Sequence, residues 1–342
     1  MRALIKLLLI GVLGLGGWAA WQLYTPVTPA PNTSLLLRPG YSTRRIAAEL
    51  KKAGVIRSVL AFRLWHMFHA KPSLKAGEYL FEREATLPLV YDRIARGDIY
   101  FHEVTIPEGY TMFDIAKTME DAGLGSASDF VHIAQTQTQL ISDLAPDASS
   151  LEGYLFPNTY QFTRTQTVQE MAATMVHQFR QVAQQMGLNS DVQQVVTMAS
   201  IVEKETAVPE ERPRVASVYY NRLARKMALD ADPSVIYAEL LTGTYQGSLH
   251  HADLAVSSPY NTYRFPGLPP GPIGNPGRSA LQAAMHPEDT QFLYFVSDGN
   301  SHHRFARSLE EHNKNVTAYR RLVNHSFSHS PDRSPAQAVG PR

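Results

Sequence analysis

Apolar residues form one unbroken run near the start of the chain and periodic patterns further on. The run extends from Leu7 to Trp21 and follows two basic residues, Arg2 and Lys6. Together with its apolar neighbours it covers about 20 residues, the length that an α-helix needs to cross a bilayer. Basic residues before the run favour a cytoplasmic N-terminus. We therefore predict a single transmembrane helix in residues 1–24, with the rest of the chain outside the cytoplasmic (inner) membrane.

A cleaved signal peptide is the alternative interpretation of this run, because Gly17-Trp18-Ala19 offers a small-x-small cleavage site. Trp18, Trp21 and Tyr24, however, are typical of the aromatic belt that holds a membrane helix at the interface. They favour an uncleaved anchor, and either form exports the remaining chain. The proline- and threonine-rich segment 25–33 is expected to be a linker.

A pattern of glycine, aromatic and apolar positions occurs twice within residues 34–149. Gly40-Tyr41-Ser42 and Gly109-Tyr110-Thr111 each follow a short β-like run and open a stretch whose apolar residues recur four positions apart. The third residue of each triplet is a good helix N-cap, and each helix is expected to end at a glycine. The repeat predicts two related α+β units, with a helix over about 58–69 and a strand over 77–81 between them.

From about residue 150 to 325 the periodicity predicts a larger, mainly helical domain. Its segment 256–277 contains six prolines and four glycines, so it can be neither a helix nor a central strand. Long loops in compact domains are usually functional, and a rigid surface loop is the alternative. Residues 326–342 are rich in serine and proline and are expected to be disordered. The other expected elements are helices over 165–186, 191–207 (from a Ser190/Gln193 capping box), 209–227 and 279–285, a strand over 292–296 and a helix from a Ser308/Glu311 capping box.

Composition excludes several functions. The chain of 342 residues has 32 Lys and Arg against 31 Asp and Glu, so it lacks the basic excess of a nucleic-acid-binding protein. It has no cysteine, which excludes disulfides, thiolate nucleophiles and sulfur-ligated metals. Histidines at 250–251, 302–303 and 312 raise the possibility of a zinc site. Adjacent histidines in an extended chain, however, point to opposite sides, which is a poor geometry for binding one metal ion. We expect no metal and, without a glycine-rich phosphate loop, no organic cofactor.

Two glutamates, Glu203 and Glu205, lie in a predicted helix that is otherwise mostly apolar. A carboxyl group beside apolar surface has its charged form disfavoured, so its pKa rises and it can act as a general acid near neutral pH. Helical geometry places Glu203 within the apolar stripe, which suits a buried pair with an arginine, and Glu205 at its edge, where it can face a cleft. This slightly favours Glu205 for catalysis; two surface glutamates that flank Lys204 are the alternative.

Glu152 and Tyr160 belong to an alternating pattern in the aromatic-rich segment 151–162. In a strand the alternating positions would share one face, and aromatic faces with a few polar groups suit sugar rings. A strand packed in the core is the alternative, although Pro157 argues against a central strand. Asn221, with its neighbours in the predicted helix, could line the same groove.

Several further motifs occur in one order along the chain. They are the helix Ala199–Val208, the segments Asp232–Tyr237, Tyr260–Tyr263 and Gly267–Ile273, and the triplets Tyr294-Phe295-Val296 and Glu311-His312-Asn313. Together they resemble the MltG/YceG family of endolytic murein transglycosylases, from the anchor to about residue 324. In that family the catalytic glutamate precedes a small hydroxyl residue, which fits Glu205 before Thr206 and does not fit Glu203. One departure is Asp230, where the family usually has glutamine; it puts local substrate contacts in doubt.

The resemblance implies an α+β protein with a LysM-like N-terminal region and a C-terminal catalytic domain that contains a lysozyme-like active-site helix. It implies a lyase that cleaves the MurNAc-GlcNAc β-1,4 bond of nascent glycan strands near the membrane. The products are 1,6-anhydro-MurNAc ends, strand elongation is terminated, and Glu205 serves as both acid and base. Partners are peptidoglycan and, by family inference, peptidoglycan synthases. The substrate-binding candidates are Glu152, Tyr160, Asn221, Asp232, Tyr260, Asn261 and Tyr263.

Two other functions fit the same residues. A hydrolytic muramidase would use water and a second carboxylate such as Glu152 or Asp232. A non-catalytic, membrane-anchored scaffold would bind peptidoglycan through the two glycine-tyrosine units and would not need Glu205. Product mass separates the first alternative from the lyase, because a reducing end is one water heavier than an anhydro end.

Overall fold

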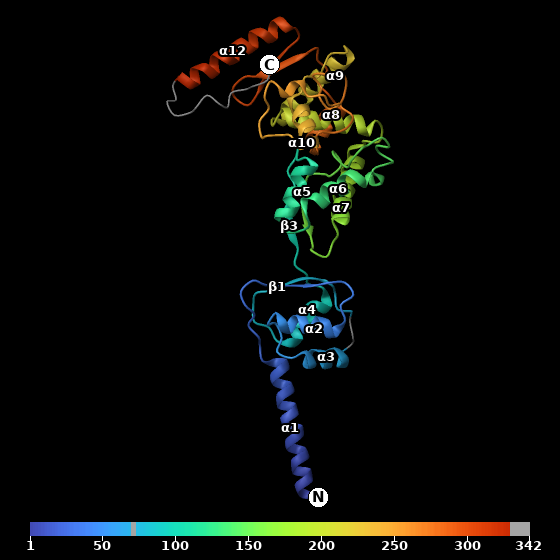
Figure 1. Ribbon diagram of the computed structural model, residues 1–342, viewed down its shortest axis with the longest axis vertical. Helices are drawn as coiled ribbons and strands as arrows, with labels where there is room; N and C mark the ends of the chain where they lie inside the picture. The colour runs from blue at the N-terminus through green and yellow to red at the C-terminus, as the bar shows by residue number, and fades with distance from the viewer. Residues whose placement is uncertain (70–72, 329–342) are drawn as a thin grey trace. The chain divides into compact units, whose positions relative to one another are not determined.

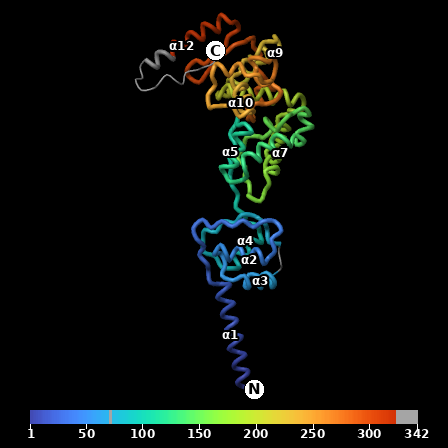
Figure 2. Tube along the Cα trace, viewed as in Figure 1, coloured from blue at the N-terminus to red at the C-terminus, as the bar shows by residue number. Residues whose placement is uncertain are grey.

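The computed structural model describes residues 1–69 and 73–328, which form two compact units (Figure 1). The first unit comprises residues 1–103 and 161–167, and the second comprises 104–160 and the described residues from 168 onward. Figure 2 traces the chain from the first unit into the second, and residues 161–167 are a short later segment that belongs to the first unit. Residues 104–149, which were predicted to belong to the N-terminal region, lie in the second unit together with most of the residues that follow.

The first unit begins with a long apolar helix, α1 (Arg2–Tyr24). Its most apolar window has a mean hydropathy of 1.9, and none of that window is buried within the protein. Among the described residues it is the one helix that is long and apolar enough to cross a membrane. The predicted N-terminal apolar helix is thus confirmed.

The rest of the first unit packs helices against a two-stranded antiparallel sheet in which Leu35 lies opposite Tyr79. Its core includes Leu37, Leu50 and Phe62, all fully buried. The expected helix over 58–69 and strand over 77–81 are both present, whereas the fourth helix was not predicted. In chain order the elements are β1 (Thr33–Leu37), α2 (Thr43–Lys52), α3 (Val59–Phe68), β2 (Gly77–Phe81) and α4 (Leu87–Arg96).

The segment 25–33, expected to be a linker, is bound to this unit. Val27 forms an antiparallel bridge with Ala85, with backbone N–H to carbonyl distances of 2.9 and 3.1 Å. The guanidinium group of Arg57 donates hydrogen bonds to the carbonyl oxygens of Thr25 and Pro26. These contacts hold the segment against the first unit, and composition does not reveal such long-range partners.

The second copy of the repeat opens the second unit. Thr111 caps α5 with a complete capping box, in which its hydroxyl accepts from the Asp114 N–H and the Asp114 carboxylate accepts from the Thr111 N–H. The strand predicted for residues 152–162 is formed only by its last four residues. Before it the chain turns at Gly153, whose φ of +89° is in the left-handed region. The elements are β3 (His102–Thr105), α5 (Met112–Asp121), α6 (Ala127–Thr136), η1 (Thr138–Leu140), β4 (Thr159–Phe162), paired with β3, and α7 (Val168–Met186).

Helix α8 (Val192–Glu205) is the central element of the second unit. It packs against α9, α10 and α11, and seven consecutive residues, 196–202, are buried. The predicted capping box at its start is wrong: Asp191 is the N-cap and makes no side-chain cap, while Gln193 donates to the Pro270 carbonyl oxygen. The elements that follow are η2 (Pro209–Glu211), α9 (Arg212–Ala224), α10 (Asp232–Thr242), η3 (Asp253–Ala255) and α11 (Arg278–Met285).

Segment 256–277 contains neither helix nor strand, as predicted. Its second half is core rather than surface, because residues 271–277 are buried. The Ile273 N–H donates to the Ser200 hydroxyl of α8 at 3.0 Å, and the Leu155 N–H donates to the Asn275 side chain at 2.9 Å. The segment therefore joins α8 to the turns around Gly153.

The chain ends in a hairpin and a long helix. Strands β5 (Tyr294–Ser297) and β6 (His303–Ala306) pair antiparallel, with Val296 opposite Arg304. Helix α12 (Leu309–Ser328) begins where predicted, and the Ser308 hydroxyl accepts from the Glu311 N–H. Disorder was expected from residue 326, but the helix includes 326–328; residues 329–342 lie outside the described part of the chain.

Gly153 provides a test of this packing. An alanine Cβ there would meet the Pro272 ring and lie 2.8 Å from the Val196 side chain, in a left-handed conformation. Gly153→Ala is expected to lower the free energy of unfolding by at least about 2 kcal/mol, since backbone strain and overpacking add. Chemical denaturation of the detergent-solubilised protein measures this. Gly247→Ala is the control, because its φ is +90° but the space is open, and an equal loss in both variants would contradict the packing argument.

Candidate active site

Glu205 is the last residue of α8, where the helix ends because Thr206 is extended, with φ −138° and ψ 129°. The Thr206 hydroxyl accepts from the Val208 N–H at 3.1 Å and so turns the chain away from the helix axis. Residues 196–202 of α8 are buried, whereas Lys204 is exposed and Glu205 is partly exposed. A carboxyl group is thus held at the boundary between an apolar core and solvent.

The surroundings of Glu205 raise its pKa to about 7. Burial is the largest cause, and the negative charge of Asp232 adds to it. A hydrogen bond with Tyr219 and the positive charge of Arg222 act in the opposite direction. At neutral pH the group is therefore divided between its protonated and ionised forms, which suits transfer of a proton in either direction.

Tyr219 and Arg222 lie three residues apart on α9 and therefore on one side of that helix. Tyr219 is 2% exposed, and its hydroxyl is hydrogen-bonded to Glu205. The Arg222 guanidinium donates to the carbonyl oxygens of Leu293 and Leu229 at 2.7 and 3.0 Å and pairs with Asp230 at 3.0 Å. These bonds fix the positive charge that acts on Glu205.

Asp232, the first residue of α10, contributes the second carboxylate of the site. The Tyr263 hydroxyl donates to its Oδ1 at 2.5 Å. Burial is the main cause that raises the pKa of Tyr263, and the charges of Asp232, Asp230 and Glu205 add to it. Of the candidates predicted from sequence, the structure thus brings Glu205, Asp232 and Tyr263 into one electrostatic group.

Glu152 lies elsewhere, inside the unit at 1% exposure. Its carboxylate accepts from the Met112 N–H, with distances of 2.9 and 3.1 Å to the two oxygens, and from the Asn275 amide at 2.7 Å. Burial raises the pKa of Glu152 to about 7, against the hydrogen bonds of Met112 and Tyr237. In this position Glu152 joins the start of α5 to the buried loop and is not open to a ligand.

The remaining predicted residues hold loops in place. The Asn261 amide donates to two backbone carbonyls of its own loop at 3.0 and 2.8 Å, and the Asn221 amide donates to those of Thr290 and Phe292 at 2.9 and 3.0 Å. The buried Tyr160 hydroxyl donates to a backbone carbonyl. Tyr260 is half-buried against Tyr237, with ring centroids 5.1 Å apart.

Glu203 has a different environment from Glu205, although it is only two residues away. Its side chain is 5% exposed and pairs with Arg212 at 2.6 Å, and the Gly277 N–H donates to its other oxygen at 2.9 Å. Arg212 also lies 3.6 Å from the carboxylate of Glu108. The expected buried pair between Glu203 and an arginine is confirmed.

Sequence reasoning missed the direct partners of Glu205. The helix around Asn221 was predicted only as a possible groove wall, and neither Tyr219 nor Arg222 was named as a site residue. The signal that could have found them is their three-residue spacing on a helix next to α8. Nothing in the sequence, however, tells which side of α9 meets Glu205.

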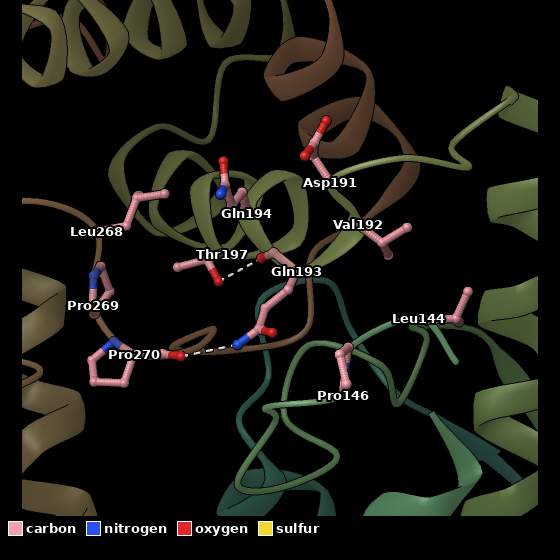
Figure 3. A pocket seen from close by; sticks show the side chains of 10 residues that line it. All are labelled: Leu144, Pro146, Asp191, Val192, Gln193, Gln194, Thr197, Leu268, Pro269 and Pro270. Atoms are coloured by element: carbon pink, nitrogen blue, oxygen red, sulfur yellow. Dashed lines mark hydrogen bonds between the residues drawn. The ribbon is translucent and has the colours of Figure 1, made fainter. Parts of the chain in front are cut away.

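A cavity of about 360 Å³ lies at the other end of α8, and Glu205 is not among its lining residues (Figure 3). Figure 3 shows Gln193 extending from the helix to the Pro270 carbonyl oxygen, a hydrogen bond of 3.2 Å. Thr197, one turn later, donates to the Gln193 carbonyl oxygen at 2.7 Å. The cavity has no titratable group other than Asp191, so it does not carry the chemistry of Glu205.

Among the side chains that the structure describes, in residues 1–69 and 73–322, no three His, Asp or Glu groups converge to hold a metal ion. The His303 imidazole lies 2.7 Å from the Glu211 carboxylate. His312 is 8% exposed and stacks on Tyr294, with centroids 5.2 Å apart. These two histidines therefore contact other side chains of the protein, which indicates a structural role.

A half-protonated carboxyl beside a tyrosine hydroxyl, an arginine and a second carboxylate is the equipment of an enzyme that transfers protons. Comparison with known proteins gives the family. The chain belongs to the YceG-like family, whose model matches residues 35–318. This confirms the resemblance seen in the sequence motifs.

Individual relatives agree over most of the chain. The endolytic murein transglycosylase of Bacillus subtilis strain 168 is 32% identical over 320 residues, which cover 87% of this chain and 88% of the relative. The protein of the same name from Streptococcus pneumoniae D39 is 30% identical over 315 residues, 82% of this chain and 57% of the relative. The crystal structure of a YceG-like protein from Listeria monocytogenes, 31% identical, superposes with a TM-score of 0.55 and covers 82% of this chain and 97% of that one.

The raised pKa of Glu205 makes a prediction about stability. Its ordinary pKa is 4.5 and its folded pKa is about 7, so its contribution to stability is complete below 4.5 and is lost as pH rises through 7. Glu205→Gln stays neutral and should therefore be more stable than the wild type at about pH 8, by about 1 to 3 kcal/mol, with little difference at about pH 4.

Denaturant midpoints at the two pH values measure this difference. The matched control is Glu210→Gln, which removes a nearby exposed carboxylate and should change neither midpoint. A Glu205→Gln variant that is equally stable relative to wild type at both pH values would contradict the burial argument.

Proposed function

We propose that this chain is an endolytic lytic transglycosylase that cleaves the MurNAc-GlcNAc β-1,4 bond of peptidoglycan glycan strands. The observation that carries the proposal is Glu205, a carboxyl group with a pKa of about 7 at the open end of α8. The names of the relatives from Bacillus and Streptococcus, endolytic murein transglycosylase, support the reaction and substrate class.

The reaction needs one carboxyl group in two protonation states. Protonated Glu205 first gives its proton to the oxygen that leaves C1 of N-acetylmuramic acid. The carboxylate then takes the proton of the C6 hydroxyl of the same sugar, and that oxygen attacks C1 to close the 1,6-anhydro ring. The intramolecular attack benefits from proximity and consumes no water, so the enzyme is a lyase. A pKa near 7 suits both steps.

The neighbours of Glu205 tune this cycle. The Tyr219 hydrogen bond and the Arg222 charge stabilise the carboxylate formed after the first step, and the Asp232 charge keeps the starting acid protonated. Asp232 and Tyr263 are the candidates that we propose to contact the sugar, with Tyr260 in the adjacent loop. Glu152, Tyr160, Asn221 and Asn261, first considered as sugar contacts, are proposed to shape the walls behind them.

We further propose that α1 is a single-pass anchor with its N-terminus in the cytoplasm and both units outside the membrane. Its length and apolarity support this, and basic residues before it favour the orientation. Anchoring restricts the enzyme to strands near the bilayer, where elongation is terminated and peptidoglycan synthases are the expected partners. A LysM-like function of the Gly-Tyr units and a lysozyme-like role of α8 complete the proposal.

Mass spectrometry of digested peptidoglycan tests the reaction. Full-length wild type in detergent should give 1,6-anhydro ends from long uncrosslinked strands. Glu205→Gln should be slower by at least about 100-fold, the contribution of a general acid. Glu210→Gln is the control and should cleave like wild type. Reducing ends would instead indicate a hydrolase with a second carboxylate, and binding without cleavage by the wild type would favour a scaffold.

The pH profile tests the role of Tyr219. Its hydrogen bond lowers the pKa of Glu205, so Tyr219→Phe should raise that pKa. Because the first step needs protonated Glu205, kcat/KM falls as pH rises through its pKa, and this alkaline limb should move upward by about half to one pH unit. Tyr220→Phe is the matched control, because the Tyr220 hydroxyl donates to the Ala284 carbonyl instead. An unmoved limb in Tyr219→Phe would rule out the tuning role.

A further inference from the structure

Helix α3 of the first unit exposes a row of large apolar side chains. Leu60, Leu64, Met67 and Phe68 are 53%, 36%, 51% and 77% exposed. Their spacing of four, three and one residues places them on one side of the helix. Few water-soluble surfaces leave such a continuous apolar row uncovered.

The row belongs to a helix that is otherwise firmly packed. Phe62 on the opposite side is fully buried, Ala61 at the edge of the row is 4% exposed, and Trp65 packs partly against the core. The Phe62 ring meets Tyr91 edge-on with centroids 5.6 Å apart. The Ser58 hydroxyl caps the helix by accepting from the Ala61 N–H. The exposed row is thus a feature of the folded unit.

The start of α3 is fixed to the end of α1. Arg57, which precedes the helix cap, donates to the carbonyl oxygens of Thr25 and Pro26, directly after the last residue of α1. Its guanidinium also lies over the Trp21 ring, 5.3 Å from the centroid. Helices α1 and α3 are in contact (Figure 1). The position of α3 along α1 is therefore set by these contacts.

This position gives α3 a depth relative to a bilayer. When α1 spans the membrane, Trp21 and Tyr24 lie at the interface, where aromatic residues gather. The helix tied to Trp21 then starts at the level of the lipid headgroups. Fully removing one large apolar side chain from water is favourable by about 1.5–3 kcal/mol, and the row supplies four.

We propose that α3 is an interfacial helix, with Leu60, Leu64, Met67 and Phe68 inserted into the outer leaflet of the membrane that α1 crosses. The proposal rests on α1 being the anchor. Its charges agree with a lipid partner: α3 contains no acidic residue, and its Arg63 is exposed and can meet anionic headgroups. The first unit is then held at the membrane in two places, by the anchor α1 and by the apolar row of α3.

Single spin labels on the full-length protein in nanodiscs test the proposal. The chain has no cysteine, so each introduced thiol is unique, and labels at exposed positions leave the core intact. Nanodiscs of phosphatidylethanolamine and phosphatidylglycerol serve as the membrane. Leu64→Cys and Phe68→Cys report on the row, and Leu13→Cys reports on the anchor. Arg38→Cys is the water control, because Arg38 is exposed and directly follows β1, a strand that lies on the side of the unit away from α1 (Figure 1).

At each label, the ratio of its collision rate with oxygen to its collision rate with a water-soluble nickel complex is measured. This ratio should be several-fold higher for the labels at 64 and 68 than for the label at 38. If they behave like the label at 38 while that at 13 lies in lipid, the interfacial helix is refuted and the anchor stands. If the label at 13 is itself in water, the anchor assignment fails. Protection of 64 and 68 from both reagents would replace the bilayer with a protein contact and also overturn the proposal.

Discussion

The proposed chemistry of this protein depends on a balance at one carboxyl group. Burial at the end of α8 raises the pKa of Glu205, and the Tyr219 hydroxyl and the Arg222 charge limit the rise. A carboxyl group without the burial would be fully ionised at neutral pH, and one without these partners would hold its proton too tightly. The surrounding helices keep both the burial and the Tyr219 and Arg222 groups in place around the two carboxyl oxygens of Glu205.

The same helix end shows how environment separates two identical residues. Glu203 faces Arg212 and the Gly277 N–H, so its oxygens are occupied and α8 is joined to the buried loop. Glu205 has one hydroxyl partner and an opening to solvent. Two positions along a helix turn a side chain by about 200°, so Glu205 faces a different environment from Glu203.

Patterns that are local in sequence predicted most elements. Caps at Ser42 and Thr111, the strand over 77–81 and the loop over 256–277 follow from spacing and turn residues. Even the buried pair of Glu203 followed from its place on the helical stripe. The strand around Gly153 failed, because a left-handed turn and its packing against Pro272 override alternation. Tyr219 and Arg222 could not be assigned to Glu205, since helix-to-helix orientation is decided by the whole core.

Arg57 has a mechanical consequence. A free linker of nine residues would behave as a flexible chain, with a root-mean-square end-to-end distance of about 15–18 Å that fluctuates continually. The Arg57 guanidinium binds the chain where it leaves α1, and Val27 is bridged to Ala85. The segment is therefore held in place and has little freedom to move. A force on the folded part of the first unit is therefore transmitted to α1 as torque as well as tension, so that part keeps a fixed orientation relative to α1.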